Sequence, residues 1–299
     1  MVTYPAAGAS PCRALTMPVS SVIDVHDPRV RDYRLLGDPR ELRTRGLFVA
    51  EGRLVVERLL RDTRYRVDSL LLNPASFAAL GPALAKRPDV TIFECPTGDF
   101  EAITGFNIHR GCLALVHRLP LLSMQDAVGA SRLVVVLEGV TDADNVGGVF
   151  RNAAAFGAGA VLLSPTCCDP LYRKAVRTSV GHVLRVPFAR VDPWPVALQE
   201  LRASGFTIAA LSPRQPAMTL DEFASSRAGD QRTALLVGTE GNGLSANAEA
   251  QADVRVRIPT FESVDSLNLA VATGIALARL NPNAGQTSGA GPAASRQRV

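Results

Sequence analysis

Three glycine-rich blocks in the C-terminal half of the chain carry the residues best suited to chemistry. They span residues 138–157, 235–244 and 257–272. The first two begin as apolar strands and then break into turns of glycine and small polar residues. Ligands of open α/β sheets bind in the crevice beyond the carboxyl ends of the strands. The three blocks therefore predict one composite site that is built from loops.

The first block predicts a strand, a turn and then a helix that carries Arg151. We expect Asp144 or Asn145 to cap this helix, and Gly147 and Gly148 to allow close approach of the backbone. A glycine-rich turn before a helix can bind phosphate. The block contains neither G-x-G-x-x-G nor G-x-x-x-x-G-K-[ST], which argues against a dinucleotide-binding or P-loop site.

The charged and polar residues of the blocks each allow two interpretations. Arg151 is expected about one turn into its helix, where a cation opposes the helix dipole, and this indicates a functional role. A pair with a nearby carboxylate would also explain it. Glu240 follows a buried strand on a tight turn, so it is either a turn-stabilising acid or a functional one. Ser266 is an adequate N-cap for the last helix, so alone it indicates little.

Composition places the chain among globular proteins with no membrane span. The 299 residues are 47% apolar and 20% charged, which suits two domains with their own cores. No apolar run approaches the ~20 residues that span a bilayer, and the N-terminus lacks the pattern of a signal peptide. Five cysteines without a C-x-x-C pair and four scattered histidines predict a reducing cytoplasm and no structural metal.

The pattern of elements predicts five segments along the chain. Residues 1–20 are expected to form a disordered extension. Residues 282–299 are expected to form a disordered tail, because that segment is rich in Gly, Ala, Ser and Pro. A smaller α/β/α domain is expected over 21–118, a linker over 119–131 and a doubly wound α/β domain over 132–281.

Within the first domain, alternating strands and helices follow a basic helical segment at 23–45. Strands are expected at 46–52, 67–72, 90–94 and 112–116, and helices at 53–61, 74–86 and 99–103. Within the second, strands are expected at 133–137, 160–163, 185–187, 207–211, 234–237 and 254–258, and helices at 147–156, 171–178, 194–204 and 268–279.

Taken together, the three blocks resemble the SpoU family of RNA ribose 2′-O-methyltransferases, in the SPOUT superfamily. The family's first motif, N-x-G-x-x-x-R-x-A, is present from Asn145 to Ala153. The second, G-x-E-G-x-G, runs from Gly238 to Gly243, and the third consists of Ile258-Pro259 and the later S-L-N that ends at Asn268. Order and approximate spacing match over about 150 residues, which makes the resemblance specific.

The resemblance implies a trefoil-knotted α/β domain that binds S-adenosyl-L-methionine, and a homodimer whose active site crosses the subunit interface. By position, the cofactor would contact Gly238, Thr239, Gly243, Ile258 and Leu267, largely through the backbone. The N-terminal segments at 48–52 and 111–116 resemble, more loosely, the ribosomal-protein-like substrate-binding domain often attached to this family.

The family's chemistry assigns roles to the polar motif residues. Arginine is protonated under ordinary conditions and is a poor base, so we expect Arg151 to orient the ribose hydroxyl and stabilise its developing negative charge. Asn145 and Glu240 would hold Arg151 and the substrate loop, and Ser266 and Asn268 would shape the pocket. Further RNA contacts are expected from basic residues elsewhere in the chain, namely Lys174, Arg177 and Arg53.

Three positions depart from the family's usual residues. Thr260 and Glu262 replace a methionine and a glycine that often follow Ile-Pro, and Ala270 stands where serine is common. These changes lie in or beside the expected cofactor loop, and they bear on the geometry of cofactor binding.

The RNA substrate is not identified by these motifs, although rRNA is favoured over tRNA. Eleven arginines between Arg29 and Arg66 predict a basic surface and salt-sensitive binding. A catalytically silent RNA-binding protein with the same fold is the alternative from another class. A SPOUT enzyme that methylates a base is disfavoured by the N-x-G-x-x-x-R motif.

Overall fold

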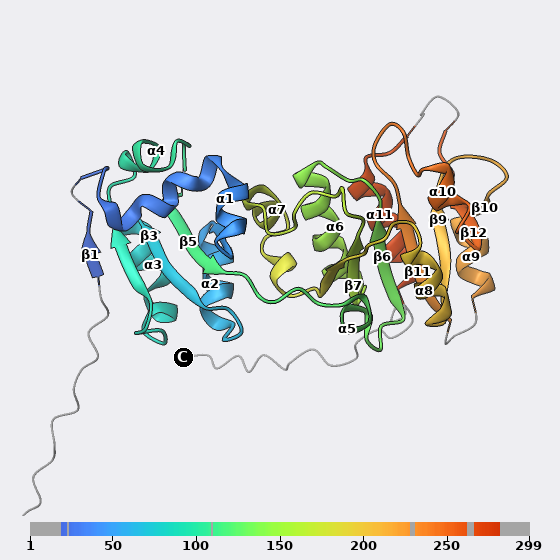
Figure 1. Cartoon of the computed structure of the whole chain (residues 1–299), viewed down its shortest axis with the longest axis horizontal. Helices are drawn as coiled ribbons and strands as arrows, with labels where there is room; N and C mark the ends of the chain where they lie inside the picture. Colours follow the sequence, from blue (N-terminus) through green and yellow to red (C-terminus); the bar gives the residue numbers. More distant parts are fainter. Residues whose placement is uncertain (1–18, 23, 109, 228–230, 262–265, 282–299) are drawn as a thin grey trace, which may run out of the picture.

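A computed structural model describes residues 19–22, 24–108, 110–227, 231–261 and 266–281. Two sheets lie side by side along the long axis of the molecule, with α7 (Arg173–Thr178) between them (Figure 1). The two ends that were predicted to be disordered lie outside the described residues, except for Val19 and Ser20. Glu262, one of the three positions that depart from the family's usual residues, lies outside them too.

The N-terminal sheet has the strand order β1-β4-β3-β5-β2. Its strands are β1 (Val19–Ser21), β2 (Leu47–Glu51), β3 (Val67–Leu72), β4 (Thr91–Glu94) and β5 (Cys112–His117). Strand β5 runs antiparallel to both β2 and β3. Because strand residues alternate between faces, Phe48 packs in the core beneath α2 (Arg53–Arg61) and α3 (Pro74–Leu84). Leu47 packs on the other face, with η1 (Pro28–Gly37), α1 (Pro39–Thr44) and α4 (Asp99–Thr104). These three layers agree with the expected α/β/α architecture.

The C-terminal sheet is entirely parallel, with the order β10-β12-β9-β11-β6-β7-β8. Its strands are β6 (Leu133–Leu137), β7 (Ala160–Leu163), β8 (Phe188–Arg190), β9 (Phe206–Leu211), β10 (Met218–Thr219), β11 (Arg232–Val237) and β12 (Val254–Arg257). The helices that accompany them are α6 (Ala143–Phe156), α7, η2 (His182–Leu184), α8 (Ala197–Ala203), α9 (Leu220–Ser226), α10 (Ala246–Glu249) and α11 (Leu269–Leu280). The carboxyl ends of these strands therefore all lie at the same edge of the sheet.

Three expected elements are corrected by the structure. The strand expected at 185–187 lies at Phe188–Arg190, because Pro187 has no backbone N–H to donate to a sheet. The expected linker contains a short helix, α5 (Met124–Val128), which Ser123 caps. The basic segment at 23–45 divides into η1 and α1, because Asp38 ends the first and caps the second.

Helix α6 begins earlier than expected. Its N-cap is Asp142, whose side chain accepts hydrogen bonds from the backbone N–H groups of Asp144 (2.8 Å) and Asn145 (2.9 Å). The prediction that Asp144 or Asn145 caps this helix is therefore wrong. Arg151 lies more than two turns inside it, so the argument from the helix dipole, which acts in the first turn, fails as well.

Gly147 and Gly148 lie inside α6 and let two other helices pack closely against it. A Cβ at Gly147 would come within 2.7 Å of the Ala175 carbonyl oxygen of α7, and one at Gly148 within 2.7 Å of the Ala270 Cβ of α11. Asn152 of α6 also donates a 2.6 Å hydrogen bond to the Ala270 carbonyl. The small side chain at Ala270 thus serves helix packing.

Helix α11 follows β12 in the chain but packs against α6, which follows β6. Two strands, β9 and β11, separate β12 from β6 in the sheet. The chain must therefore cross back over the carboxyl ends of these strands before α11 begins. This crossing brings the third block beside the first two.

A pair of glycine substitutions tests the close helix packing. Gly147→Ala should lower the free energy of unfolding by about 1–3 kcal/mol, because the added methyl group meets backbone that cannot move aside. Gly37→Ala adds the same methyl group where no atom lies within 4 Å, and it should change stability by less than about 0.5 kcal/mol. Urea unfolding of both variants measures the difference, and equal stabilities would contradict the role of Gly147.

Candidate active site

Three polar residues from the three blocks meet at the carboxyl edge of the C-terminal sheet. The Asn268 side-chain amide donates hydrogen bonds to Asn145 Oδ1 (3.0 Å) and to Glu240 Oε1 (2.9 Å). Its own Oδ1 accepts from the Val271 backbone N–H and caps α11. Ser266, expected as an N-cap, is therefore not the cap of this helix. Asn145 is buried, while Glu240 and Asn268 are exposed.

Glu240 contacts the N-terminus of α11, where its Oε1 also accepts from the Leu269 N–H at 3.3 Å. A carboxylate is favoured at the positive end of a helix dipole. Glu240 thus joins the loop after β11 to the start of α11, which is the structural role allowed for it from the sequence. Its negative charge remains exposed at the edge of the neighbouring cavity.

The loop after β11 folds tightly because its glycines permit it. A Cβ at the buried Gly238 would come within 2.2 Å of the Gly243 carbonyl carbon. Gly241 (φ 82°) and Gly243 (φ 68°) adopt left-handed conformations that disfavour other residues. The Gly243 N–H donates to the Thr239 carbonyl at 3.0 Å and closes the turn.

This loop lines a cavity of about 380 Å³. The five residues expected to contact a cofactor all line it, together with three of the polar motif residues: Gly238, Thr239, Gly243, Ile258, Leu267, Glu240, Ser266 and Asn268. Thr260, one of the departures, lines it too. Two further lining residues were not predicted, namely Leu211, which ends β9, and Ser212, which follows it. Their position next to β11 in the sheet, not a motif, brings them there.

Within one chain, Arg151 lies apart from the cluster of Asn145, Glu240 and Asn268. It lies roughly 9 Å along the axis of α6 and about 120° around it from Asn145. Its exposed side chain makes no hydrogen bond or ion pair with another described residue. It lines a shallow groove with Val271 and Ile275 of α11. Burial, followed by the charges of Arg58, Arg185 and Arg151, lowers the pKa of the nearby His182.

The basic residues expected to contact RNA already have partners. Lys174 Nζ lies 2.8 Å from Asp144 Oδ2, and hydrogen bonds from Lys174 and then Thr178 lower the pKa of Asp144. Arg177 pairs with Glu51 at 3.1 Å. Arg53 donates to Ser76 Oγ at 2.9 Å. Lys174 and Arg177 therefore connect α7 to its neighbours, and their contact with RNA stays a prediction.

Glu138, at the end of β6, was given no role from the sequence. Its Oε1 accepts hydrogen bonds from Trp194 Nε1 and Ser245 Oγ, both at 2.7 Å, and its Oε2 accepts from the Ser245 N–H at 2.8 Å. One carboxylate thus fixes the end of the loop after β11 and the segment before α8. Spacing alone could not reveal it, because its partners are 56 and 107 residues away.

The described cysteines and acidic residues suggest no metal centre. Cys95, Cys112, Cys167 and Cys168 are free, and burial raises the pKa of Cys168 to about 11. In the described ranges, no group of three or more His, Cys, Asp or Glu side chains could hold a metal ion. Nor does any helix there have the length and apolar character to cross a membrane.

The arrangement of the three blocks agrees with the comparison to known families. A model of the SpoU rRNA Methylase family matches residues 132–278. A protein of Mycobacterium tuberculosis named as an uncharacterized tRNA/rRNA methyltransferase is 42% identical over 262 residues, which cover 86% of this chain and 90% of that protein. The chain belongs to the SpoU family. Its enzymatic class is RNA methyltransferase, as predicted.

Solved structures confirm the predicted fold class. The S-adenosylmethionine-bound rRNA methyltransferase of Sinorhizobium meliloti superimposes with a TM-score of 0.76 at 25% identity, over 90% of this chain and 99% of that one. The SpoU methyltransferase AviRb of Streptomyces viridochromogenes gives 0.71 at 22% identity, over 85% and 96%. Both domains of this chain therefore have counterparts in SpoU structures.

The contacts of Glu138 predict a measurable contribution to stability. Glu138→Ala should lower the free energy of unfolding by about 1–3 kcal/mol, because three donors lose one acceptor. It should also shift the emission of Trp194, the only tryptophan in the chain. Ser245→Ala removes one of the three donors, together with the N-cap that its Oγ provides to the Ala248 N–H of α10, and it should shift the Trp194 emission less than Glu138→Ala does. Denaturant unfolding followed by Trp194 fluorescence measures both, and an unchanged Glu138→Ala midpoint would contradict this role.

Proposed function

We propose that this RNA methyltransferase transfers a methyl group from S-adenosyl-L-methionine to a ribose 2′-hydroxyl of structured RNA. We further propose rRNA over tRNA as the substrate, and the cytoplasm as the location. The observation that carries the proposal is the Asn145–Asn268–Glu240 cluster, which unites the three motifs of the family beside one cavity.

The cavity suits S-adenosyl-L-methionine in size and chemistry. Gly238, Gly241 and Gly243 line the cavity without side chains, so a ligand can reach the backbone of the loop. Ile258, Leu267 and Leu211 supply apolar wall, and Glu240 places a carboxylate at the rim, where a cationic sulfonium is favoured. The S. meliloti relative, described as bound to S-adenosylmethionine, supports the same choice. When bound, this cofactor supplies a methyl group that is already activated by positive charge.

The remaining task of the protein is to orient the hydroxyl and stabilise the charge that develops on its oxygen. Arg151 is the residue we assign to it, because its guanidinium has no partner in the described chain and can pair with an RNA phosphate. Fixed positive charge near the reacting oxygen stabilises the transition state, and the proton that the hydroxyl loses passes to solvent, because protonated arginine cannot accept it. Positioning supplies much of the remaining rate, since the displacement must be in line.

We propose that a second copy of the chain brings Arg151 to this cluster. Arg151 shares its groove on α6 and α11 with two exposed apolar residues, Val271 (52% exposed) and Ile275 (41%). A two-fold axis through this face would bury both residues against their equivalents. It would also bring Arg151 of each subunit across the interface, toward the Asn145–Asn268–Glu240 cluster of the other subunit. Within its own chain, Arg151 is separated from that cluster.

Arg151→Ala tests the assignment of the reaction. The wild-type protein should yield alkali-resistant dinucleotides from rRNA of a deletion strain, because a 2′-O-methyl group blocks cleavage at the next phosphate. Arg151→Ala should lower this rate by about 100-fold or more while it still binds S-adenosylhomocysteine. Arg61→Ala, at an exposed position elsewhere, should keep the wild-type rate.

Two results would overturn the proposal. Methylated nucleotides that remain sensitive to alkali would indicate base methylation. Calorimetry that detects no binding of S-adenosylhomocysteine to the wild-type protein would favour a silent RNA-binding protein.

Ile275→Glu tests the proposed dimer. A charge at the centre of the apolar face should convert the dimer into monomers and abolish methylation, because Arg151 could no longer reach the partner's site. Leu121→Glu introduces the same charge at a residue that is 71% exposed outside this face, and it should leave both properties unchanged. Sedimentation velocity measures the mass, and a fully active monomer would exclude a shared site.

A further inference from the structure

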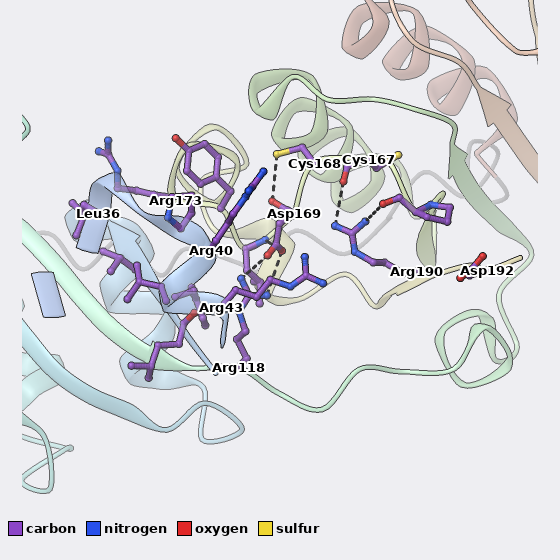
Figure 2. A pocket seen from close by; sticks show the side chains of 18 residues that line it. Leu36, Arg40, Arg43, Arg118, Cys167, Cys168, Asp169, Arg173, Arg190 and Asp192 are labelled. Carbon is purple, nitrogen blue, oxygen red and sulfur yellow. Dashed lines mark hydrogen bonds and ion pairs between the residues drawn. The ribbon is translucent and has the colours of Figure 1, made fainter. Parts of the chain in front are cut away.

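A second cavity, of about 620 Å³, lies where the N-terminal unit meets the C-terminal sheet. Helix α1 forms one wall, and the segments that follow β7 and β8 form the other. Figure 2 shows Arg40 and Arg43 on the N-terminal side of the cavity and Arg190 on the opposite side. None of the three glycine-rich motifs contributes to it.

Five arginines and two aspartates line this cavity, and the arginines differ in how they are neutralised. Arg118 pairs with Asp169 at 2.6 Å, and Arg173 pairs with Glu51 at 2.5 Å. These two bridges are largely buried and join the two units. They leave little net charge of their own.

The other three guanidinium groups have no carboxylate partner among the described residues. Arg190 donates to the carbonyl oxygens of Pro165 (2.9 Å) and Cys167 (3.1 Å), which orient it without cancelling its charge. The side chains of Arg40 and Arg43 are exposed and form no ion pair with a described residue. Three positive charges therefore face one cavity from two sides, against the single carboxylate of Asp192 that no ion pair with a described residue neutralises, and this balance favours an anionic ligand.

The rest of the wall is partly apolar. Tyr172 is half-buried, and the buried Leu171 and Leu36 line the same cavity. A cavity that combines guanidinium groups with an aromatic ring suits a nucleotide, because the phosphate pairs with arginine and the base stacks on the ring. A simple inorganic anion would leave the apolar wall uncovered.

The cavity opens on the same sheet edge as the candidate active site. Strands β8, β7, β6 and β11 are parallel neighbours, so the segments after β8 and the loop after β11 lie roughly 15 Å apart, at about 4.8 Å per strand. Helix α7, with Lys174 and Arg177 exposed, lies along this path. One RNA strand could follow the edge from the cavity to the cofactor loop.

We propose that this cavity binds a nucleotide of the RNA substrate that flanks the methylated one, with its phosphate between Arg40, Arg43 and Arg190 and its base against Tyr172. The proposal rests on the proposed function, because it assigns the ligand to the same RNA. It adds a contact that neither unit forms alone, since the phosphate site takes arginines from both.

Arg40→Gln combined with Arg43→Gln tests the phosphate contact. RNA from a deletion strain should bind the double variant on the order of tenfold more weakly, and the slope of log affinity against log salt should fall by about 1–2. Arg31→Gln combined with Arg61→Gln removes the same charge from exposed residues outside the cavity, and it should change affinity far less. Equal losses in both double variants would overturn the proposal, because only net charge would then matter.

Tyr172 provides an independent test of the stacked base. Tyr172→Ala should weaken RNA binding at least about fivefold, whereas Tyr172→Phe keeps the ring and should restore wild-type affinity. Photo-crosslinking of 4-thiouridine-labelled RNA should place adducts on residues 165–173, and adducts confined to other segments would contradict the assignment.

The binding of S-adenosylhomocysteine separates failure of this proposal from failure of the proposed function. All these variants should bind it as the wild type does, because the cavity shares no residue with the cofactor loop. A wild-type protein that does not methylate ribose would overturn the proposed function, while the RNA-binding measurements would still decide the role of the cavity. RNA binding insensitive to every cavity variant, in an active methyltransferase, would overturn the cavity proposal alone.

Discussion

The side chain of Asn268 is the point on which the geometry of the candidate site depends. Its amide group joins Asn145 of α6 to Glu240 of the loop after β11, and its carbonyl oxygen caps α11. An asparagine side chain has two N–H donors and one carbonyl acceptor, and each of these functions is engaged here. An aspartate could cap the helix but would face two further acceptors, and a leucine could do neither. The residue type is therefore dictated by three partners that lie far apart in sequence.

This arrangement requires that α11 return to α6 after β12, and small residues make the return feasible. Gly148 and Ala270 leave room for close contact, and Asn152 donates to the Ala270 carbonyl at the crossing. On the other side of α6, Gly147 admits α7. The glycines of the first motif therefore position helices, while those of the second motif shape a loop. The two sets share a residue type but differ in the physical constraint that selects it.

Local signals in the sequence predicted much of the fold and little of the geometry between distant segments. Strands β3 and β6 and helix α2 have the predicted bounds, because apolar runs and an amphipathic pattern define them without tertiary contacts. The cap at Asp142 was missed because Asp142, Asp144 and Asn145 lie within four residues and each could begin the helix. The separation of Arg151 from Asn145 could not be predicted from motif spacing, because it requires the start of α6. Glu138 and the cavity beside α1 depend on contacts between segments more than fifty residues apart.

The ion pairs of α7 do not exclude it from contact with RNA, and their relative burial shows why. The bridge between Arg173 and Glu51 is largely buried, with 15% and 13% of the two side chains exposed, so breaking it would strand a charge away from water. Lys174 and Arg177 are 42% and 47% exposed, and pairs so open to solvent contribute about 0–1 kcal/mol. A phosphodiester could therefore replace Asp144 or Glu51 as their partner at little cost in stability. Arg173 would meanwhile keep α7 attached to β2. Because of this division, one short helix can hold the two units together and still offer two cations to an RNA strand that follows the sheet edge.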